Sequence, residues 1–401
     1  SFNVISENII DGNNVVAIDL DCSSNKYNTI EGNTINDNNY GIDVDLSCFN
    51  VFQNNTVHGN SVGFSLDTSE SNVIIENDIQ DSWNGIYLYS SSNSNVSFNT
   101  IRDCSFNGIY LLYSENSVLK ENEMINCGLL VYGVDLSDYI NDVDTSNKIN
   151  GKTLYYYMDE NGITVPSDAG EVILINCEYC TLQNLDLSDG TIGVELAYSN
   201  YNTIKENTLN NNNFAGVYLE SSSDNTVKTN TIENNYYGID LQLAYDNNIK
   251  RNNIKINTYG CFLYLSDSNT ISRNNILYNT YGIRINIPSN SNSIHHNNLI
   301  DNGFNAWDEN ENTNAWDDGK KGNYWGDYET KYPNARRIWL KGVWDTPYDI
   351  DIEDNQDRYP LIMPSVTSRG KMVNLIHVNV LKKFFERFPN SFPILQYIIG
   401  L

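Results

Sequence analysis

This sequence lacks the features of a membrane-spanning protein and of a nucleic-acid-binding protein. It contains no apolar stretch of about 18 residues, so it predicts no transmembrane helix. Lysine and arginine together number 24 against 51 aspartate and glutamate residues, and the formal net charge is −27. Such a charge repels phosphate backbones, so we expect no nucleic-acid partner. No signal peptide is visible, and a strand-like run already occupies Val15–Leu20, so we expect a processed product or a fragment.

Side chains that ligate metals are also scarce. The four histidines are His58, His295, His296 and His377, and methionine also numbers only four. Adjacent residues of a strand point to opposite faces, so we expect that His295 and His296 do not ligate one ion together. The sequence has no cluster of Met, His and Cys of the kind that copper sites use. We therefore predict no metal site among these residues.

A short pattern recurs along most of the chain: Asn, an aliphatic residue, Asn, then Gly followed by an aliphatic residue. Most steps between copies are 22 or 23 residues. The first asparagine of each copy is Asn33, Asn55, Asn77, Asn99, Asn122, Asn207, Asn230, Asn252, Asn274 or Asn297. The glycine is Gly41, Gly63, Gly85, Gly108, Gly133, Gly193, Gly216, Gly238, Gly260 or Gly282. A fixed period of this length indicates a solenoid.

Each repeat holds three short apolar runs, as the segment 225–244 shows. Apolar and polar residues alternate within each run, which indicates strands, and the Asn and Gly residues between the runs permit corners. Three strands and three corners in about 22 residues make one rung of a parallel β-helix. The sequence therefore predicts an all-β solenoid.

Stacked rungs place equivalent residues in columns about 4.8 Å apart. Two columns are predicted to point into the core. The first contains Ile42, Phe64, Ile86, Ile109, Val134, Val194, Val217, Ile239, Cys261 and Ile283. The second contains Val44, Leu66, Leu88, Leu111, Leu136, Leu196, Leu219, Leu241, Leu263 and Ile285. The asparagine columns are expected to hydrogen-bond from rung to rung.

Changes in this pattern divide the chain into five parts. Residues 1–137 form a first run of coils, residues 138–180 an excursion with irregular rungs, and residues 181–302 a second run. Residues 303–364 contain five of the six tryptophans, which predicts an irregular aromatic cap on the coil end. Residues 365–401 carry apolar side chains at helical spacing, which predicts an amphipathic helical tail.

Four of the seven cysteines fall into two vertical pairs. Cys104 and Cys127 occupy the same corner position one rung apart, and Cys22 and Cys48 both lie two residues after an inward leucine. The rung spacing matches the Cα separation of a disulfide, so we predict both bridges and an oxidising, extracytoplasmic setting. Seven reduced and packed thiols are the alternative.

The outward positions of the glycine-containing strand carry carboxylates and tyrosines. We select as a ligand-binding face Asp19, Asp21, Asp43, Asp45, Asp67, Tyr87, Tyr89, Tyr110 and Asp135. Carboxylates stacked one rung apart repel each other and gain from a cation or a hydroxyl-rich ligand, and tyrosine rings suit the apolar faces of sugars. The face therefore predicts glycan binding, and it leaves open one cofactor, Ca²⁺. A solvated acidic face, with tyrosines present for their strand propensity, is the alternative.

The coils resemble the right-handed parallel β-helix repeats of NosD-like proteins, also called CASH domains, over roughly residues 1–302. Residues 150–185 are similar to the excursion of archaeal NosD-like surface proteins, and GNYWGDY at 322–328 and DTPYDI at 345–350 resemble their closing segment. The resemblance implies a right-handed solenoid at or outside the cell surface. It does not transfer the copper-maturation role behind the family name, because coils specify the fold and not the activity.

Several functions stay open at this point. We favour an extracellular or cell-surface protein without catalytic activity that binds polysaccharide or serves as a structural element of the envelope. Assembly into a filament or layer, through an open first rung or the apolar tail, is an alternative. A lyase, epimerase or hydrolase that uses Asp43, Asp45 and Asp67 is another, although the DPHE string of β-helix epimerases and the polygalacturonase strings are absent. The scarcity of copper ligands argues against a copper-maturation factor.

Overall fold

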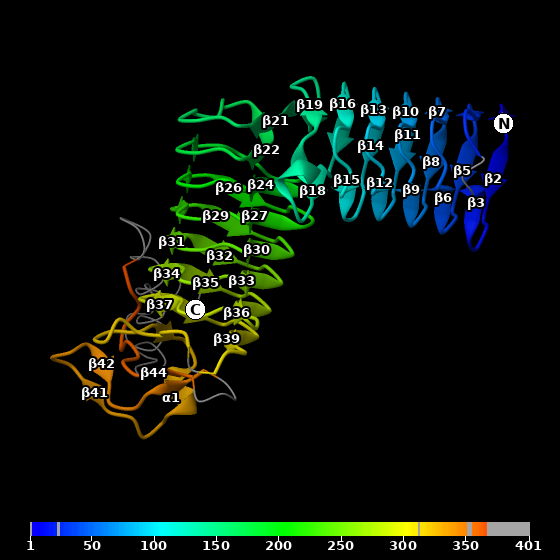
Figure 1. Ribbon diagram of the computed structural model, residues 1–401. Coiled ribbons are helices and arrows are strands. Elements are labelled where there is room, and N and C mark those ends of the chain that lie inside the picture. The colour runs from blue at the N-terminus through cyan, green and yellow to red at the C-terminus, as the bar shows by residue number, and fades with distance from the viewer. Residues whose placement is uncertain (1, 22–24, 312, 351–354, 367–401) are drawn as a thin grey trace, which may run out of the picture.

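The computed structural model describes residues 2–21, 25–311, 313–350 and 355–366. Short strands wind into successive coils, and the predicted all-β parallel β-helix is confirmed. The coils stack along two different axes, so that two arms meet at an elbow (Figure 1). We call the coils from β1 to β20 the N-terminal arm and those from β22 to β40 the C-terminal arm.

Each arm is built from three sheets, to which every regular coil contributes one strand. In the N-terminal arm the first sheet contains β1 (Val4–Ser6), β4 (Thr29–Glu31), β7 (Val51–Gln53), β10 (Val73–Ile75), β13 (Asn95–Ser97), β16 (Val118–Lys120) and β19 (Asp142–Val143). The second contains β2 (Ile9–Asp11), β5 (Thr34–Asn36), β8 (Thr56–His58), β11 (Asp78–Gln80), β14 (Thr100–Arg102), β17 (Glu123–Ile125) and β20 (Lys148–Ile149). The third has longer strands: β3 (Val16–Asp21), β6 (Tyr40–Asp45), β9 (Val62–Asp67), β12 (Asn84–Tyr89), β15 (Asn107–Leu112) and β18 (Leu129–Tyr132).

The C-terminal arm repeats this arrangement. Its short-strand sheets contain β23 (Thr181–Gln183), β25 (Thr203–Lys205), β28 (Thr226–Lys228), β31 (Asn248–Lys250), β34 (Thr270–Ser272) and β37 (Ser293–His295), and β26 (Thr208–Asn210), β29 (Thr231–Glu233), β32 (Asn253–Lys255), β35 (Asn275–Leu277), β38 (Asn298–Ile300) and β40 (Tyr324–Trp325). Its long strands are β22 (Ala169–Ile175), β24 (Ile192–Ala197), β27 (Ala215–Glu220), β30 (Tyr237–Gln242), β33 (Tyr259–Tyr264), β36 (Tyr281–Ile285) and β39 (Phe304–Asp308).

The core follows the predicted columns over most of both arms. Ile86 pairs with Phe64 on one side and Ile109 on the other, and all three side chains are fully buried. In each of these coils a glycine stands directly before the inward residue, because the backbones of neighbouring rungs approach closely there. A Cβ atom on Gly41 would lie 2.6 Å from the carbonyl oxygen of Gly63, a distance that no larger residue tolerates.

The asparagine columns hydrogen-bond between rungs, as expected. The Asn77 side-chain amide donates to Asn99 Oδ1 at 3.0 Å and to the Phe52 carbonyl at 3.0 Å. The left-handed backbone angle at this corner belongs to the preceding residue, Glu76, with φ of 56°. The asparagine is therefore selected for its buried amide, and the hydrogen bonds that it makes offset the backbone strain beside it.

The regular pattern ends earlier than predicted in the N-terminal arm. Gly128, and not Gly133, follows Gly108 in the glycine column, and Leu129 and Val131 continue the two inward columns. The predictions for Val134 and Leu136 are therefore wrong. Val134 is 65 % exposed, and Leu136 begins a short 3₁₀ helix, η1 (Leu136–Tyr139).

A change of sheet partners produces the elbow. The strand β21 (Lys152–Met158) pairs antiparallel with β20 and parallel with β22, which pairs in turn with β24. The second sheet of the N-terminal arm thereby continues into the long-strand sheet of the C-terminal arm, 15 strands in all. The third sheet of the N-terminal arm ends at β18, whose free edge faces the C-terminal arm.

An irregular aromatic segment follows the last coil. It contains α1 (Tyr328–Lys331) and two small hairpins, β41 (Arg337–Ile338) with β42 (Val343–Trp344), and β43 (Tyr348–Asp349) with β44 (Gln356–Asp357). The Trp325 and Tyr348 rings stack at 3.9 Å between centroids.

No helix among the described residues is long and apolar enough to cross a membrane. The predicted tail helix lies outside the described residues, apart from positions 365 and 366.

Candidate functional site

The structure brings eight of the nine selected residues onto one surface, the outer face of the β3–β18 sheet. Strand register aligns Asp19 with Asp43, and it aligns Asp21, Asp45 and Asp67 in a second column. Tyr87 continues the first column and pairs with Tyr110, and Tyr89 continues the second. We call these eight residues the acidic–tyrosine face.

Asp135 does not belong to this face. It caps the 3₁₀ helix η1, and its position on the lattice is taken by Leu130 in β18, which pairs with Tyr110. The error has the same cause as the misplaced Val134, because the coil closes before residue 133.

The aspartates of the face crowd one another. Partial burial raises the pKa of Asp43, and the neighbouring Asp19 and Asp45 charges raise it further. The pKa of Asp45 is also raised, by desolvation and by Asp67 and Asp21. Each of these shifts is relieved when a cation or a hydrogen-bond donor approaches the column.

The tyrosines form a connected group of rings toward the elbow, some stacked and some edge-on. The rings of Tyr87 and Tyr110 lie 5.3 Å apart and nearly parallel, and Tyr89 lies edge-on to Tyr113 at 5.9 Å. All of these tyrosines remain partly exposed. The face therefore offers flat aromatic surface beside carboxylates, the combination that binds sugar rings in proteins.

Buried carboxyl groups line the elbow where this face meets the C-terminal arm. We call Glu171, Glu195, Glu220 and Asp240 the elbow carboxylates. The backbone N–H of Leu129 donates to Glu171 Oε1 at 3.1 Å. Together with Thr191 Oγ1, which accepts from the Gly128 N–H at 2.8 Å, this carboxyl caps the free edge of β18 in place of another strand.

Burial dominates the protonation of the elbow carboxylates. It raises the pKa of Glu171 and Glu195 well above the ordinary range, that of Glu220 to about 7 and that of Asp240 to about 8. The Tyr218 hydroxyl donates to Glu220 at 2.7 Å and opposes its shift. Glu171 Oε2, Glu195 Oε1 and Asp240 Oδ1 are buried without a hydrogen-bond partner.

Sequence reasoning did not identify the elbow carboxylates as buried. Glu195, Glu220 and Asp240 occupy outward lattice positions, which are solvated on an isolated coil. The N-terminal arm, which packs against these positions at the elbow, removes that solvent. The one local signal is Glu171, which stands inside the otherwise apolar strand AGEVILI.

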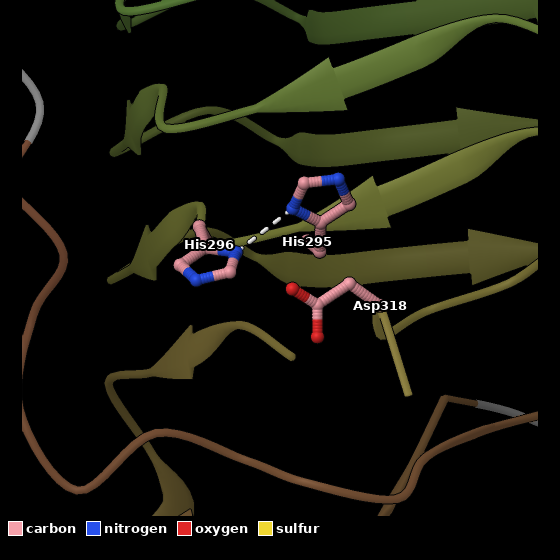
Figure 2. A group of neighbouring side chains, drawn as sticks. All are labelled: His295, His296 and Asp318. Atoms are coloured by element: carbon pink, nitrogen blue, oxygen red, sulfur yellow. Dashed lines mark hydrogen bonds between the residues drawn. The ribbon is translucent and has the colours of Figure 1, made fainter. Parts of the chain in front are cut away.

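A histidine pair forms a third cluster, at the corner after β37 (Figure 2). The Nδ1 atoms of His295 and His296 lie 2.8 Å apart, and ligand atoms from both rings and from Asp318 all lie within 4.8 Å of one another. The expectation that the two histidines point apart is wrong. His296 is not on the strand but adopts a left-handed corner conformation with φ of 59°, which returns its ring to the side of His295.

The surroundings favour the neutral form of both imidazoles, although the Asp318 charge opposes the effect. Burial lowers the pKa of His295 and of His296, and the positive charge of Arg273 adds to the shift at each. Asp318 stays charged, because backbone N–H groups of Lys321 and Lys320 bond its carboxylate and hold its pKa low against partial burial.

The predicted disulfide between Cys104 and Cys127 is absent, and both residues are free thiols. The two residues do stack at equivalent corners, but the Cys127 thiol donates to the carbonyls of Ile101 and Ile125 at 3.7 and 3.4 Å. An asparagine amide makes the same two bonds at this corner in other coils, so the thiol replaces an amide. Cys48 is also a free thiol, and its proposed partner Cys22 lies outside the described residues.

One hollow lies away from the acidic–tyrosine face. It has a volume of about 580 Å³ and is formed by the corners that follow β24, β27 and β30. Tyr198, Tyr201, Asp224 and Tyr245 contribute to its lining.

Comparison with solved structures finds similar chains at low identity. A periplasmic alginate epimerase, AlgG, is 14 % identical, with 72 % of this chain and 75 % of that chain covered and a TM-score of 0.36. The Dettilon tailspike protein is 12 % identical over 74 % and 56 %, with a TM-score of 0.32. The A-module of the Azotobacter vinelandii mannuronan C-5 epimerase AlgE4 is 13 % identical over 78 % and 86 %, with a TM-score of 0.28.

Two protein-family models match the chain. No curated protein matches the chain. The model of a right-handed β-helix region matches residues 1–79, and the model described as periplasmic copper-binding protein (NosD) matches residues 47–157 and 140–330. The two NosD matches together span well over half of the chain and both arms, and the chain belongs to the NosD family of right-handed parallel β-helix proteins.

Proposed function

We propose that this protein lies outside the cytoplasm and binds a polysaccharide along the acidic–tyrosine face without cleaving it. The observation that carries the proposal is the partly exposed stack of Tyr87 and Tyr110 in line with the aspartate columns. The columns run along the arm, across successive rungs. An extended sugar chain laid along them contacts several tyrosines and carboxylates at once, so weak single contacts add up.

The charge of the face sets which glycans it accepts. Asp45 and Asp67 repel acidic sugars, whereas hydroxyl groups and amino sugars donate hydrogen bonds to carboxylates. We expect neutral or amino-sugar polymers to bind in the presence of a chelator. Acidic polymers are expected to bind only when Ca²⁺ bridges the two sets of carboxylates.

A glycan array followed by calorimetry, with EDTA and with Ca²⁺, tests this proposal. Replacing Tyr87 or Tyr110 by alanine is expected to weaken binding roughly three- to tenfold, because each removes one stacking surface. Tyr278→Ala is the matched control, since Tyr278 is 57 % exposed on a corner of the other arm. Binding that is insensitive to Tyr87→Ala and Tyr110→Ala, or silence across the array, contradicts the proposal.

The alternatives predict different outcomes. A lyase, epimerase or hydrolase acting through Asp43, Asp45 and Asp67 changes the polysaccharide, so recovery of an unaltered polymer after long incubation separates binding from catalysis.

Self-association through the first rung or the tail stays a prediction, and light scattering of the full chain tests it.

A further inference from the structure

The histidine cluster joins two parts of the fold that are distant in sequence. His295 ends β37, where it pairs with Ser272 of the previous coil, and His296 forms the next corner. Asp318 lies between β39 and β40, in the first part of the aromatic cap. The backbone N–H of His296 donates to the Gly322 carbonyl at 2.6 Å, so the corner and the cap segment are directly bonded.

The ligand atoms are held in place from several directions. Asp318 Oδ1 accepts the backbone N–H groups of Lys320 and Lys321 at 2.9 and 2.7 Å, which fixes the carboxylate and leaves its second oxygen for a ligand. The neighbouring Asp317 is bonded to Arg358, with 2.7 Å between Oδ1 and Nη2. The carboxylate of Asp318 lies beside both imidazole rings in Figure 2.

The spacing is close to what one metal ion requires. Nitrogens that ligate a tetrahedral Zn²⁺ lie roughly 3.3 Å apart, given bonds of about 2.0 Å. The Nδ1 atoms lie 2.8 Å apart across a hydrogen bond, so an ion that takes the place of the shared proton, which moves to Nε2 of the same ring, needs only a small ring rotation. Among the described residues, this is the one group of three or more His, Cys, Asp or Glu side chains whose candidate ligand atoms all lie within 4.8 Å of one another.

We propose that His295, His296 and Asp318 bind a divalent transition-metal ion of the zinc class and thereby fasten the cap to the last coils. The donor set is two imidazoles and a carboxylate, and no cysteine belongs to it. It fits Zn²⁺ or Cu²⁺, and it does not fit Cu⁺, which soft sulfur ligands hold. The fourth position of a tetrahedral ion is open to water.

Titration of the metal-stripped full chain with Zn²⁺ in a calorimeter tests the site. We expect one equivalent to bind, and His296→Asn and Asp318→Asn each to weaken binding at least tenfold. Asparagine accepts the left-handed angle at 296 and keeps the hydrogen-bond acceptor at 318, so both variants retain the local backbone. Bound Zn²⁺ is also expected to raise the melting temperature of the wild type but not of His296→Asn.

His58→Asn is the matched control, because His58 also contacts a carboxylate, Asp81, at 2.8 Å but forms no three-residue cluster. It is expected to leave Zn²⁺ affinity unchanged, as is His377→Asn. With Cu²⁺ as the probe, electron paramagnetic resonance is expected to show coupling to two imidazole nitrogens that is lost in His296→Asn. The proposal is overturned if Zn²⁺ does not bind, if binding survives the double variant His295→Gln/His296→Asn, or if it is lost in His58→Asn or His377→Asn.

Discussion

At the scale of single residues, Asp240 shows how the elbow changes the chemistry of an ordinary side chain. Burial raises its pKa from 3.8 to about 8, so the folded protein holds a proton that the unfolded chain releases above about pH 4. The folded pKa lies above the unfolded one. The contribution of Asp240 to the free energy of unfolding is therefore most favourable below about pH 4 and declines as the pH rises to 8.

Asp240→Asn is expected to remove this pH dependence. The amide keeps the shape without the charge, so raising the pH from 5 to 9 is expected to lower the unfolding free energy of the wild type by roughly 1–3 kcal/mol more than that of the variant. Urea denaturation at the two pH values measures the difference, with Asp19→Asn, at an exposed position, as the control. An equal effect at both pH values contradicts the assignment of a protonated carboxyl at neutral pH.

At the scale of elements, the asparagine ladders connect one coil to the next at the corners. Asn77 accepts the backbone N–H of Asn55 at 2.9 Å, and its own amide donates to Asn99 and to the Phe52 carbonyl. Fixed spacing in the sequence was sufficient to predict these ladders, because every coil repeats the same geometry. The preceding left-handed residues were not predicted, since they vary freely in type.

Asn77→Ala is expected to lower the free energy of unfolding by roughly 2–5 kcal/mol, because it leaves several buried polar groups of neighbouring coils without partners. Asn39→Ala, at an exposed position in the same arm, is expected to change it by less than about 0.5 kcal/mol. Chemical denaturation of both variants measures the contrast. Similar losses in the two would show that the buried ladder contributes nothing beyond an ordinary surface asparagine.

At the scale of the whole molecule, the sequence predicts each arm but not their junction. The recurring glycine and asparagine define the columns, and with them the face from Asp19 to Tyr110. The prediction placed Gly133 in the glycine column, but the coil after Gly108 is shorter and closes at Gly128. The exchange of sheet partners through β21 and β22 has no local signature, so the burial of Glu195 and the approach of Asp318 to the histidines follow only from the folded structure.

Hydroxyl-radical footprinting of tyrosines, with and without a bound polysaccharide, tests the proposed binding face most directly. The account predicts that oxidation of Tyr87, Tyr89 and Tyr110 slows when the polysaccharide binds, while oxidation of Tyr278 is unchanged. Protection of Tyr201 in the hollow of the C-terminal arm, with Tyr87 and Tyr110 still oxidised at their original rates, would contradict it.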